Sequence, residues 1–217
     1  GAKLIVDGGI ISSDRSDDFW YGISVLGDRT KSQDATGMQG VVETKNGATI
    51  SNALHAIMAG DEVFRDFSKS GGILRISNTR FINNKHSVGF WSFENKAVWP
   101  VGVHKPNRSF ITNCLFELND QYPYDKSDMP SRAPQHQISA YQIDGIRIQG
   151  CTIENKMSLA KRNRIGGSGD GIVAFESEFS VSDYCPTIIT GTPCTATTII
   201  PSVIKGFSNG IRSESVV

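Results

Sequence analysis

The sequence lacks a net charge, a long hydrophobic run and any long amphipathic helical pattern. Its 22 basic residues balance its 22 acidic residues, so the chain has no electrostatic footprint for nucleic acid or for an anionic membrane. No apolar run approaches the roughly 18 residues that span a bilayer. The nearest helical candidate, residues 52–59, alternates as a strand does. We therefore expect neither a nucleic-acid partner nor a transmembrane segment.

Motifs that carry catalysis or hold cofactors are also missing. We find no nucleophile elbow, phosphate loop or dinucleotide fingerprint. No two histidines stand at metal-ligand spacing and no Cys-x-x-Cys pair occurs. His55 and His86 open successive predicted strands, which favours a partly exposed ladder, and the acidic cluster at 14–18 is interpreted as a solvated turn rather than a calcium loop. We predict no catalytic residue, cofactor or metal.

What the sequence does contain is a repeated phrase. An apolar residue recurs at its first and sixth positions, around small residues at the third or fourth, and successive copies start 35 and 37 residues apart. The three copies are Ile76-Ser-Asn-Thr-Arg-Phe81, Ile111-Thr-Asn-Cys-Leu-Phe116 and Ile148-Gln-Gly-Cys-Thr-Ile153. Weaker copies start at Val6, Lys45 and Val203. A repeat buries its apolar face only by stacking on its neighbours, so these residues should form continuous buried columns.

A second short strand follows each phrase, with glycine, asparagine and aspartate at the joins. Strands returning in the same order imply parallel pairing between turns. We predict an all-β fold, a right-handed parallel β-helix of about six turns, forming a single domain over residues 1–217. The surplus length leaves as long lateral loops, which are expected at residues 26–39, 61–70, 94–108, 119–135, 156–169 and 182–201.

The four cysteines form two different pairs. Cys185 and Cys194 lie nine residues apart in a stretch rich in threonine and proline, which favours a disulfide and an oxidising, extracytoplasmic setting. Cys114 and Cys151 occupy equivalent positions of the repeat, and stacked, buried free thiols are favoured there over a bridge.

Sugar chemistry is the activity that the remaining residues leave open. Aromatic side chains near the second strands could stack on the apolar face of a pyranose, and packing of loops onto the solenoid is the alternative role. The candidate glycan-contacting aromatics are Trp20, Tyr21, Trp91, Trp99, Tyr122 and Tyr124. Glycoside hydrolysis needs two carboxylates across one cleft. The two Asp-Gly-Ile sequences place Asp144 and Asp170 in different strands of their turns, so they should not pair.

Together the repeated phrase, the strand Trp20–Val25 and the segments 41–50 and 71–84 resemble the right-handed parallel β-helix regions of large secreted or surface-attached proteins of Bacteroidetes-type bacteria. The resemblance covers essentially residues 1–215 and is specific for the fold. It implies export by a type IX secretion system, with an extracellular or cell-surface location and further domains flanking this chain. It carries no agreed catalytic set.

Two hypotheses follow from the sequence. The first is a non-catalytic β-helix segment that serves as a rigid stalk or as an adhesive surface, with an extracellular polysaccharide or a host cell surface as its partner. The second is a polysaccharide-active enzyme, a lyase or glycosidase, using a groove on the same helix. Charged side chains from adjacent turns that converge in a groove would favour the enzyme.

Overall fold

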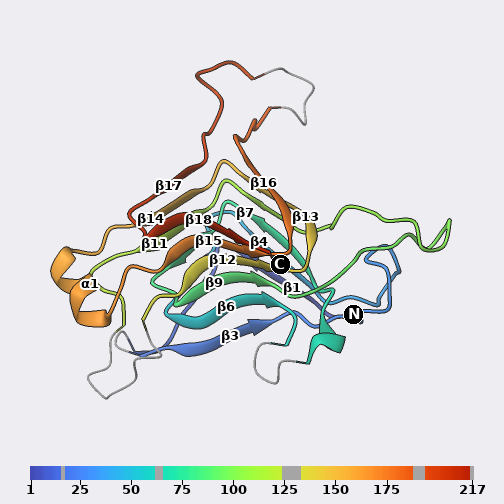
Figure 1. Ribbon diagram of the computed structural model, residues 1–217, viewed down its shortest axis with the longest axis horizontal. Coiled ribbons are helices and arrows are strands. Elements are labelled where there is room, and N and C mark those ends of the chain that lie inside the picture. The colour runs from blue at the N-terminus through green and yellow to red at the C-terminus, as the bar shows by residue number, and fades with distance from the viewer. Residues whose placement is uncertain (16–17, 62–65, 124–132, 188–193, 216–217) are drawn as a thin grey trace.

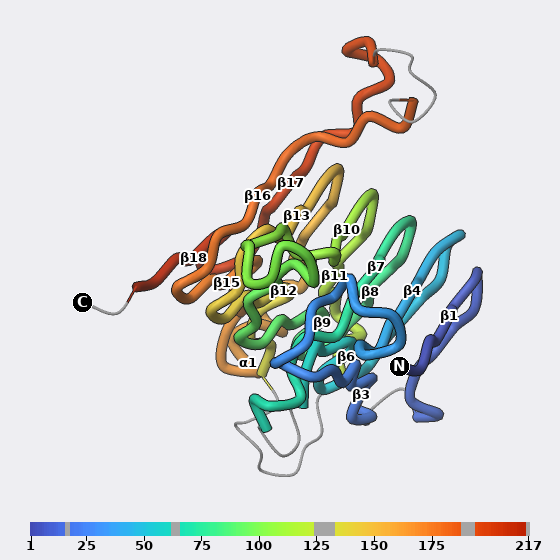
Figure 2. Tube along the Cα trace, turned by 90° about the vertical axis from the view of Figure 1, so that its right-hand side faces the viewer, coloured from blue at the N-terminus to red at the C-terminus, as the bar shows by residue number. Residues whose placement is uncertain are grey.

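The computed structural model describes residues 1–15, 18–61, 66–123, 133–187 and 194–215. The chain forms a β-solenoid with three parallel sheets, each of six strands, which we name A, B and C (Figure 1). Figure 2 shows the successive turns from β1 to β16 standing side by side along the solenoid axis. The predicted all-β parallel β-helix is therefore confirmed.

Each turn contributes one strand to each sheet. Sheet A contains β1 (Lys3–Asp7), β4 (Val41–Lys45), β7 (Ile73–Ser77), β10 (Phe110–Thr112), β13 (Asp144–Gln149) and β16 (Glu178–Ser182). Sheet B contains β2 (Ile10–Ile11), β5 (Thr49–Ser51), β8 (Arg80–Ile82), β11 (Leu115–Leu118), β14 (Thr152–Asn155) and β17 (Val203–Lys205). Sheet C contains β3 (Trp20–Ser24), β6 (Ala53–Ala59), β9 (His86–Phe90), β12 (His136–Tyr141), β15 (Asp170–Phe175) and β18 (Asn209–Glu214).

The predicted buried columns form in register. In sheet A, Ile111 lies between Ile76 and Ile148, and these three residues make up the isoleucine column. In sheet B, Phe116 lies between Phe81 and Ile153. All of these side chains are buried in one continuous core. The apolar positions of the repeat therefore set the pairing between turns, because a shift by one residue would turn the whole set outward.

The repeated phrase is a bend between two strands rather than a single strand. Its first residue is the second to last of a sheet A strand, and its sixth lies in sheet B. Its third has a left-handed backbone in every clear copy, with φ of 45° at Asn78, 51° at Asn113 and 61° at Gly150. Asparagine and glycine adopt this conformation at least cost. A turn consequently has three strands where the sequence pattern predicted two.

The last turn is interrupted. β1 to β16 complete five circuits, after which β17 and β18 add strands to sheets B and C only. The sequence placed the start of the last copy at Val203, but this residue pairs with Thr152 in sheet B. The first position of the last copy is instead occupied by Val181, which lies in sheet A and pairs with Ile148. An insertion separates the two halves of the copy, and its described residues, 183–187 and 194–202, extend beyond the solenoid in Figure 2.

The long loops leave at three corners rather than one. Those near 26–39, 61–70 and 94–108 join sheet C to sheet A, those near 119–135 and 156–169 join sheet B to sheet C, and the one near 182–201 joins sheet A to sheet B. Three loops at one corner place polar segments along the edge of sheet A.

Two short helices lie in the described parts of these loops. The 3-10 helix η1 (Phe67–Lys69) follows β6, and α1 (Leu159–Ile165) covers residues that the sequence assigned to a loop. The Ser158 side chain caps the amino end of α1 by accepting from the Lys161 amide, and Gly166, with φ of 84°, ends it. Because the helix has only seven residues, it shows no sustained apolar stripe in the sequence. No helix among the described residues is long and apolar enough to cross a bilayer.

Candidate functional site

Three histidines align on neighbouring strands of sheet C. His86 is the register partner of both His55 and His136, with ring centroids 5.8 Å and 4.3 Å away, respectively. Asp170 continues the same row on β15. We call the three histidines the histidine ladder. The sequence predicted the first two members and left His136 out, because the insertion at 119–135 changes its spacing.

His86 and His136 of the ladder are neutral at physiological pH. Burial, followed by the repulsion that protonated His136 and His55 would exert, holds the pKa of His86 well below its ordinary value. Burial also lowers the pKa of His136 to about 4, although the Asp170 carboxylate acts in the opposite direction. The face of sheet C therefore carries ring nitrogens that exchange hydrogen bonds without carrying charge.

Ser139 lies beside the ladder. Its Oγ is 2.9 Å from Nε2 of His86, and the same nitrogen is 3.1 Å from the Val88 carbonyl oxygen. A carbonyl oxygen only accepts, so Nε2 carries the proton that it donates there. The nitrogen then has no lone pair with which to take a proton from Ser139. This arrangement orients a hydroxyl group and does not activate a nucleophile.

Aromatic rings form a second row on the same sheet. Trp91 and Tyr141 lie with ring centroids 5.8 Å apart, Tyr141 stacks on Phe175 at 5.1 Å, and Phe67 of η1 meets Trp91 edge-on at 5.1 Å. We call these four residues the aromatic shelf. Tyr141 and Phe175 are register partners, so the parallel pairing of β12 and β15 places their rings face to face.

The histidine ladder and the aromatic shelf meet in a pocket of about 230 Å³, the sheet C pocket. Trp91, Tyr141 and Phe175 line one part of it, and His86, His136 and Ser139 are among its polar lining. The indole Nε1 of Trp91 is buried and has no hydrogen-bond partner among the residues that the structure describes. Apolar ring surface beside a few neutral hydrogen-bonding groups is the usual composition of a small-ligand site.

The aromatic residues singled out from the sequence do not form one surface. Trp91 alone of them lines the sheet C pocket. The Trp20 indole donates to the Ser51 carbonyl oxygen at 2.8 Å, whereas Tyr21 and Trp99 are 72% and 83% exposed. Tyr124 lies outside the described residues.

Tyr122 is a core residue. Only 1% of its surface is exposed, and its ring lies 5.3 Å from that of Phe19 in a second apolar cluster with Met157 and Ile165. It is therefore unavailable to a glycan at the surface. The sequence did not separate it from exposed aromatics because it lies in a loop without periodic burial.

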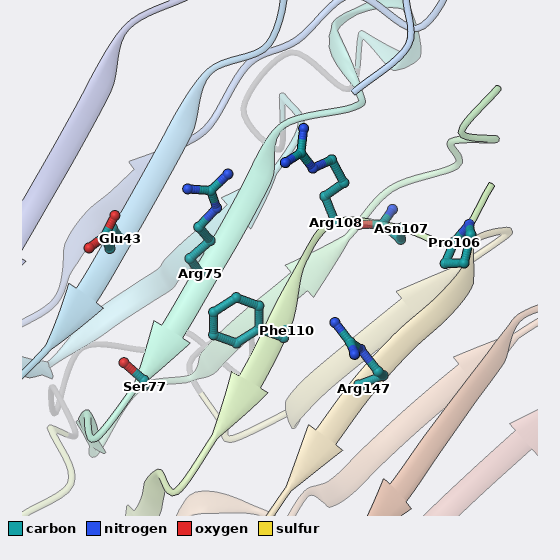
Figure 3. Close-up of a pocket in the computed structure, with 8 residues that line it drawn as sticks. All are labelled: Glu43, Arg75, Ser77, Pro106, Asn107, Arg108, Phe110 and Arg147. Carbon is teal, nitrogen blue, oxygen red and sulfur yellow. The ribbon is translucent and has the colours of Figure 1, made fainter. Parts of the chain in front are cut away.

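A second hollow lies on the outer face of sheet A. It measures about 870 Å³, and we call it the sheet A groove (Figure 3). Glu43, Arg75, Phe110 and Arg147 line it from four successive strands in one register row. The last three each directly precede a member of the isoleucine column. Because alternate residues of a strand face opposite sides, that position in the repeat could have revealed the row from the sequence.

Loops from the corner between sheets C and A wall this groove. Asn107 and Arg108 line it, and Oε1 of Gln33 accepts from the Arg108 amide at 2.8 Å. The Arg108 guanidinium also pairs with Asp34 at 3.2 Å, and Asn95 binds the Gln33 amide at 3.0 Å. Two loops therefore hold each other in place at the edge of the groove.

The carboxylates do not form an acid and base pair. Asp144 and Asp170 lie in sheets A and C, as the sequence indicated. Glu117 and Glu154 are register partners in sheet B, but Lys156 bridges them at 2.8 and 2.6 Å. The pKa of each falls below its ordinary value because hydrogen bonds to lysine outweigh the opposing effect of burial. Both stay ionised, so neither supplies the proton that a glycosidase acid must deliver.

Four further carboxyl groups have a lowered pKa: Asp28, Glu43, Asp66 and Glu94. At Glu43 the main cause is the hydrogen bond that its carboxylate accepts from Lys3. Within the described ranges, no group of three or more histidine, cysteine, aspartate or glutamate residues could hold a metal ion.

Cys185 and Cys194 form the predicted disulfide, with Cα atoms 5.8 Å apart. Cys114 and Cys151 are free and buried, as expected for stacked small residues of the repeat. Burial is the main cause that raises the pKa of Cys114 well above its ordinary value, so this thiol stays protonated and unreactive.

Comparisons with family models, with curated proteins and with solved structures found no match to the chain.

Proposed function

We propose that this chain is a non-catalytic segment of a large bacterial extracellular protein, serving as a rigid β-helical stalk with an adhesive, glycan-contacting surface. The observation that carries the proposal is the sheet C pocket, in which the rings of Trp91 and Tyr141 lie beside neutral polar groups of His136 and Ser139. A sugar ring combines an apolar C–H face with hydroxyl groups at its rim. Aromatic rings fit the first and the histidine and serine groups fit the second.

Rigidity suits this role. Three parallel sheets run the length of the solenoid, and every strand pairs with a strand of a neighbouring turn. A site carried on strands keeps its geometry better than one carried on loops. The pocket draws its ligand groups from β9, β12 and β15, so three consecutive turns fix it.

An extracellular location follows from the same proposal. The Cys185–Cys194 disulfide supports an oxidising compartment. Export by a type IX secretion system, and a Bacteroidetes-type source, rest on the resemblance of the repeated phrase to β-helix regions of such proteins.

A polysaccharide lyase is the second candidate, and one observation favours it. Charged side chains from adjacent turns, Glu43, Arg75 and Arg147, converge on the sheet A groove, which is the feature expected of an enzyme. An arginine can serve as the base of an elimination only when it loses its proton, and an exposed guanidinium keeps it. Arg147 is exposed and Arg75 is partly exposed. We therefore assign the groove to binding.

The test combines binding with turnover. Neutral oligosaccharides are titrated while tryptophan fluorescence is recorded, and the same mixtures are assayed for unsaturated products and for new reducing ends. We expect saturable binding that Tyr141→Ala weakens about tenfold or more, since one sugar–aromatic contact contributes on the order of 1 to 1.5 kcal/mol. Trp99→Ala, which removes an exposed loop ring, serves as the control and should bind as the wild type does. Turnover of any oligosaccharide, or binding indifferent to Tyr141, contradicts the proposal.

A further inference from the structure

The sheet A groove holds two arginines with no counter-charge. Arg75 on β7 and Arg147 on β13 both line it, and among the residues that the structure describes neither guanidinium has an ion-pair or hydrogen-bond partner. The neighbouring charges are already matched. Glu43 pairs with Lys3 at 2.7 Å and with Lys45 at 3.5 Å, and Asp34 pairs with Arg108 at 3.2 Å and with Lys105 at 3.3 Å. Among the described residues that line the groove, Arg75 and Arg147 are therefore the arginines without a carboxylate partner.

The spacing of these two arginines is fixed by the solenoid. Phe110 pairs with both of them in register, so one strand separates the two. Neighbouring strands lie about 4.8 Å apart, which puts the two backbone positions about 10 Å apart along the solenoid axis. In Figure 3 the Phe110 ring lies between the two guanidinium groups. Along the solenoid axis, the aromatic ring of Phe110 thus stands between two positively charged side chains, and each of the three residues lies on its own strand.

We propose that the sheet A groove binds a linear acidic polysaccharide lying along the solenoid axis, with an anionic group on every second sugar. The distance between the arginines is close to the length of two pyranose units in an extended chain. Each guanidinium pairs with a carboxylate or sulfate through two parallel hydrogen bonds. The sugar between them lays its C–H face on Phe110. This site lies on a different sheet from the proposed sugar-binding pocket and needs an anionic rather than a neutral ligand, so the two proposals stand or fall separately.

The walls of the groove suit an extended chain. Its volume of about 870 Å³ exceeds that of the sheet C pocket, and it is lined from four successive turns. Asn107 is buried in its wall, and its Oδ1 accepts from the Ser109 amide at 2.9 Å, which fixes the loop at the entrance to β10. A nucleic acid is less suited, because the chain has no net positive charge to attract a uniformly charged backbone.

Binding of defined polymers tests the proposal. The probes are hyaluronan, with one carboxylate per two sugars; chondroitin sulfate, which adds a sulfate ester; cellohexaose, which is neutral; and poly(dT). We expect hyaluronan or chondroitin sulfate to bind in a salt-dependent manner, with the comparison of the two showing which anion is preferred. Arg75→Gln and Arg147→Gln should each weaken binding about tenfold or more, and the double variant should abolish it.

Two further variants test whether binding depends on the paired donors of the guanidinium and on the position of the charge in the groove. Arg75→Lys keeps the charge but loses the paired donors, so its affinity should lie between those of the wild type and Arg75→Gln. Arg80→Gln removes an exposed arginine of the same turn from sheet B and should leave binding unchanged. Thermal melting confirms that each variant is folded. Equal binding of cellohexaose, tighter binding of poly(dT), or an effect of Arg80→Gln as large as that of Arg75→Gln would overturn the proposal.

Discussion

Phe81 and Phe116 stack face to face inside the solenoid, with ring centroids 4.7 Å apart and planes inclined by only 6°. They are register partners on β8 and β11 and are fully buried. Their stacking joins two consecutive turns through the core, in the same way that Ile76 and Ile111 join the sheet A strands of those turns. The repeat thus contributes to stability through contacts between copies rather than within one copy.

Truncation of this stack should be costly. Phe116→Ala removes a ring packed against the turns on both sides, and we expect it to lower the free energy of unfolding by about 3 to 5 kcal/mol. The measurement is urea denaturation followed by circular dichroism. Tyr21→Ala, which truncates a ring that is 72% exposed, is the matched control and should change stability by less than about 0.5 kcal/mol. Similar losses for the two variants would show that the stack does not join the turns.

Two substitutions of the corner residue Asn113 should distinguish the contribution of its backbone conformation to stability from that of its side chain. It has φ of 51°, and its side-chain amide donates to that of Asn78 in the preceding turn. Asn113→Gly keeps the left-handed conformation and loses only this bond, at about 1 kcal/mol. Asn113→Val also strains the backbone and should cost about 1 to 2 kcal/mol more. Equal denaturation midpoints for the two variants would mean that the corner tolerates any residue.

The histidine ladder makes stability depend on pH. The pKa of His136 is lowered to about 4 in the folded protein, so between its ordinary value of about 6.5 and 4 the unfolded chain binds the proton more tightly. Stability should therefore fall as the pH drops through this window, by up to about 3 kcal/mol from this residue. His86, whose pKa is also lowered, acts with the same sign.

Denaturation midpoints of the wild type and of His136→Gln, measured from pH 7 to pH 4, give the contribution of this histidine. The two proteins differ only at this side chain, so the difference between the two curves isolates the contribution of His136 and of its interactions. We expect the variant to lose less stability on acidification. Parallel curves would show that the proton on His136 does not oppose folding.

Thiol counting tests the cysteine assignments. A thiol reagent should find no reactive cysteine in the native protein, because Cys185 and Cys194 are bonded and Cys114 and Cys151 are buried. Unfolding without a reductant should reveal two thiols, and unfolding after reduction should reveal all four cysteines. Detection of four thiols before reduction would show that Cys185 and Cys194 are not bonded. The proposed extracellular location would then lose one of its supports.

The sequence was sufficient to predict the fold because burial repeats with it. The isoleucine column and the stack at Phe116 recur at nearly constant spacing, and both form as predicted. The corner inside each phrase was missed, because the left-handed conformation of Asn113 leaves no trace in hydrophobic periodicity. The helix α1 was missed for a related reason, since its seven residues sit in a loop between two strands.

The candidate sites were harder to predict because they depend on outward positions and on loops. Arg75 and Arg147 are unremarkable in the sequence until the register aligns them with Phe110. His136 joins the ladder only once the insertion before it is recognised as a loop. Tyr122 shows the opposite error. The sequence suggested a surface residue that contacts glycan, whereas the ring is buried in an apolar cluster.

The most direct test of the account is a glycan array probed with the wild type, Tyr141→Ala and the Arg75→Gln, Arg147→Gln double variant. We predict that the wild type binds both neutral and acidic glycans on the array without altering them. Tyr141→Ala should lose the neutral signals and keep the acidic ones, and the double arginine variant should show the reverse. Absence of binding by the folded wild type, or loss of both classes of signal in either variant, would contradict two separate glycan sites on this β-helix.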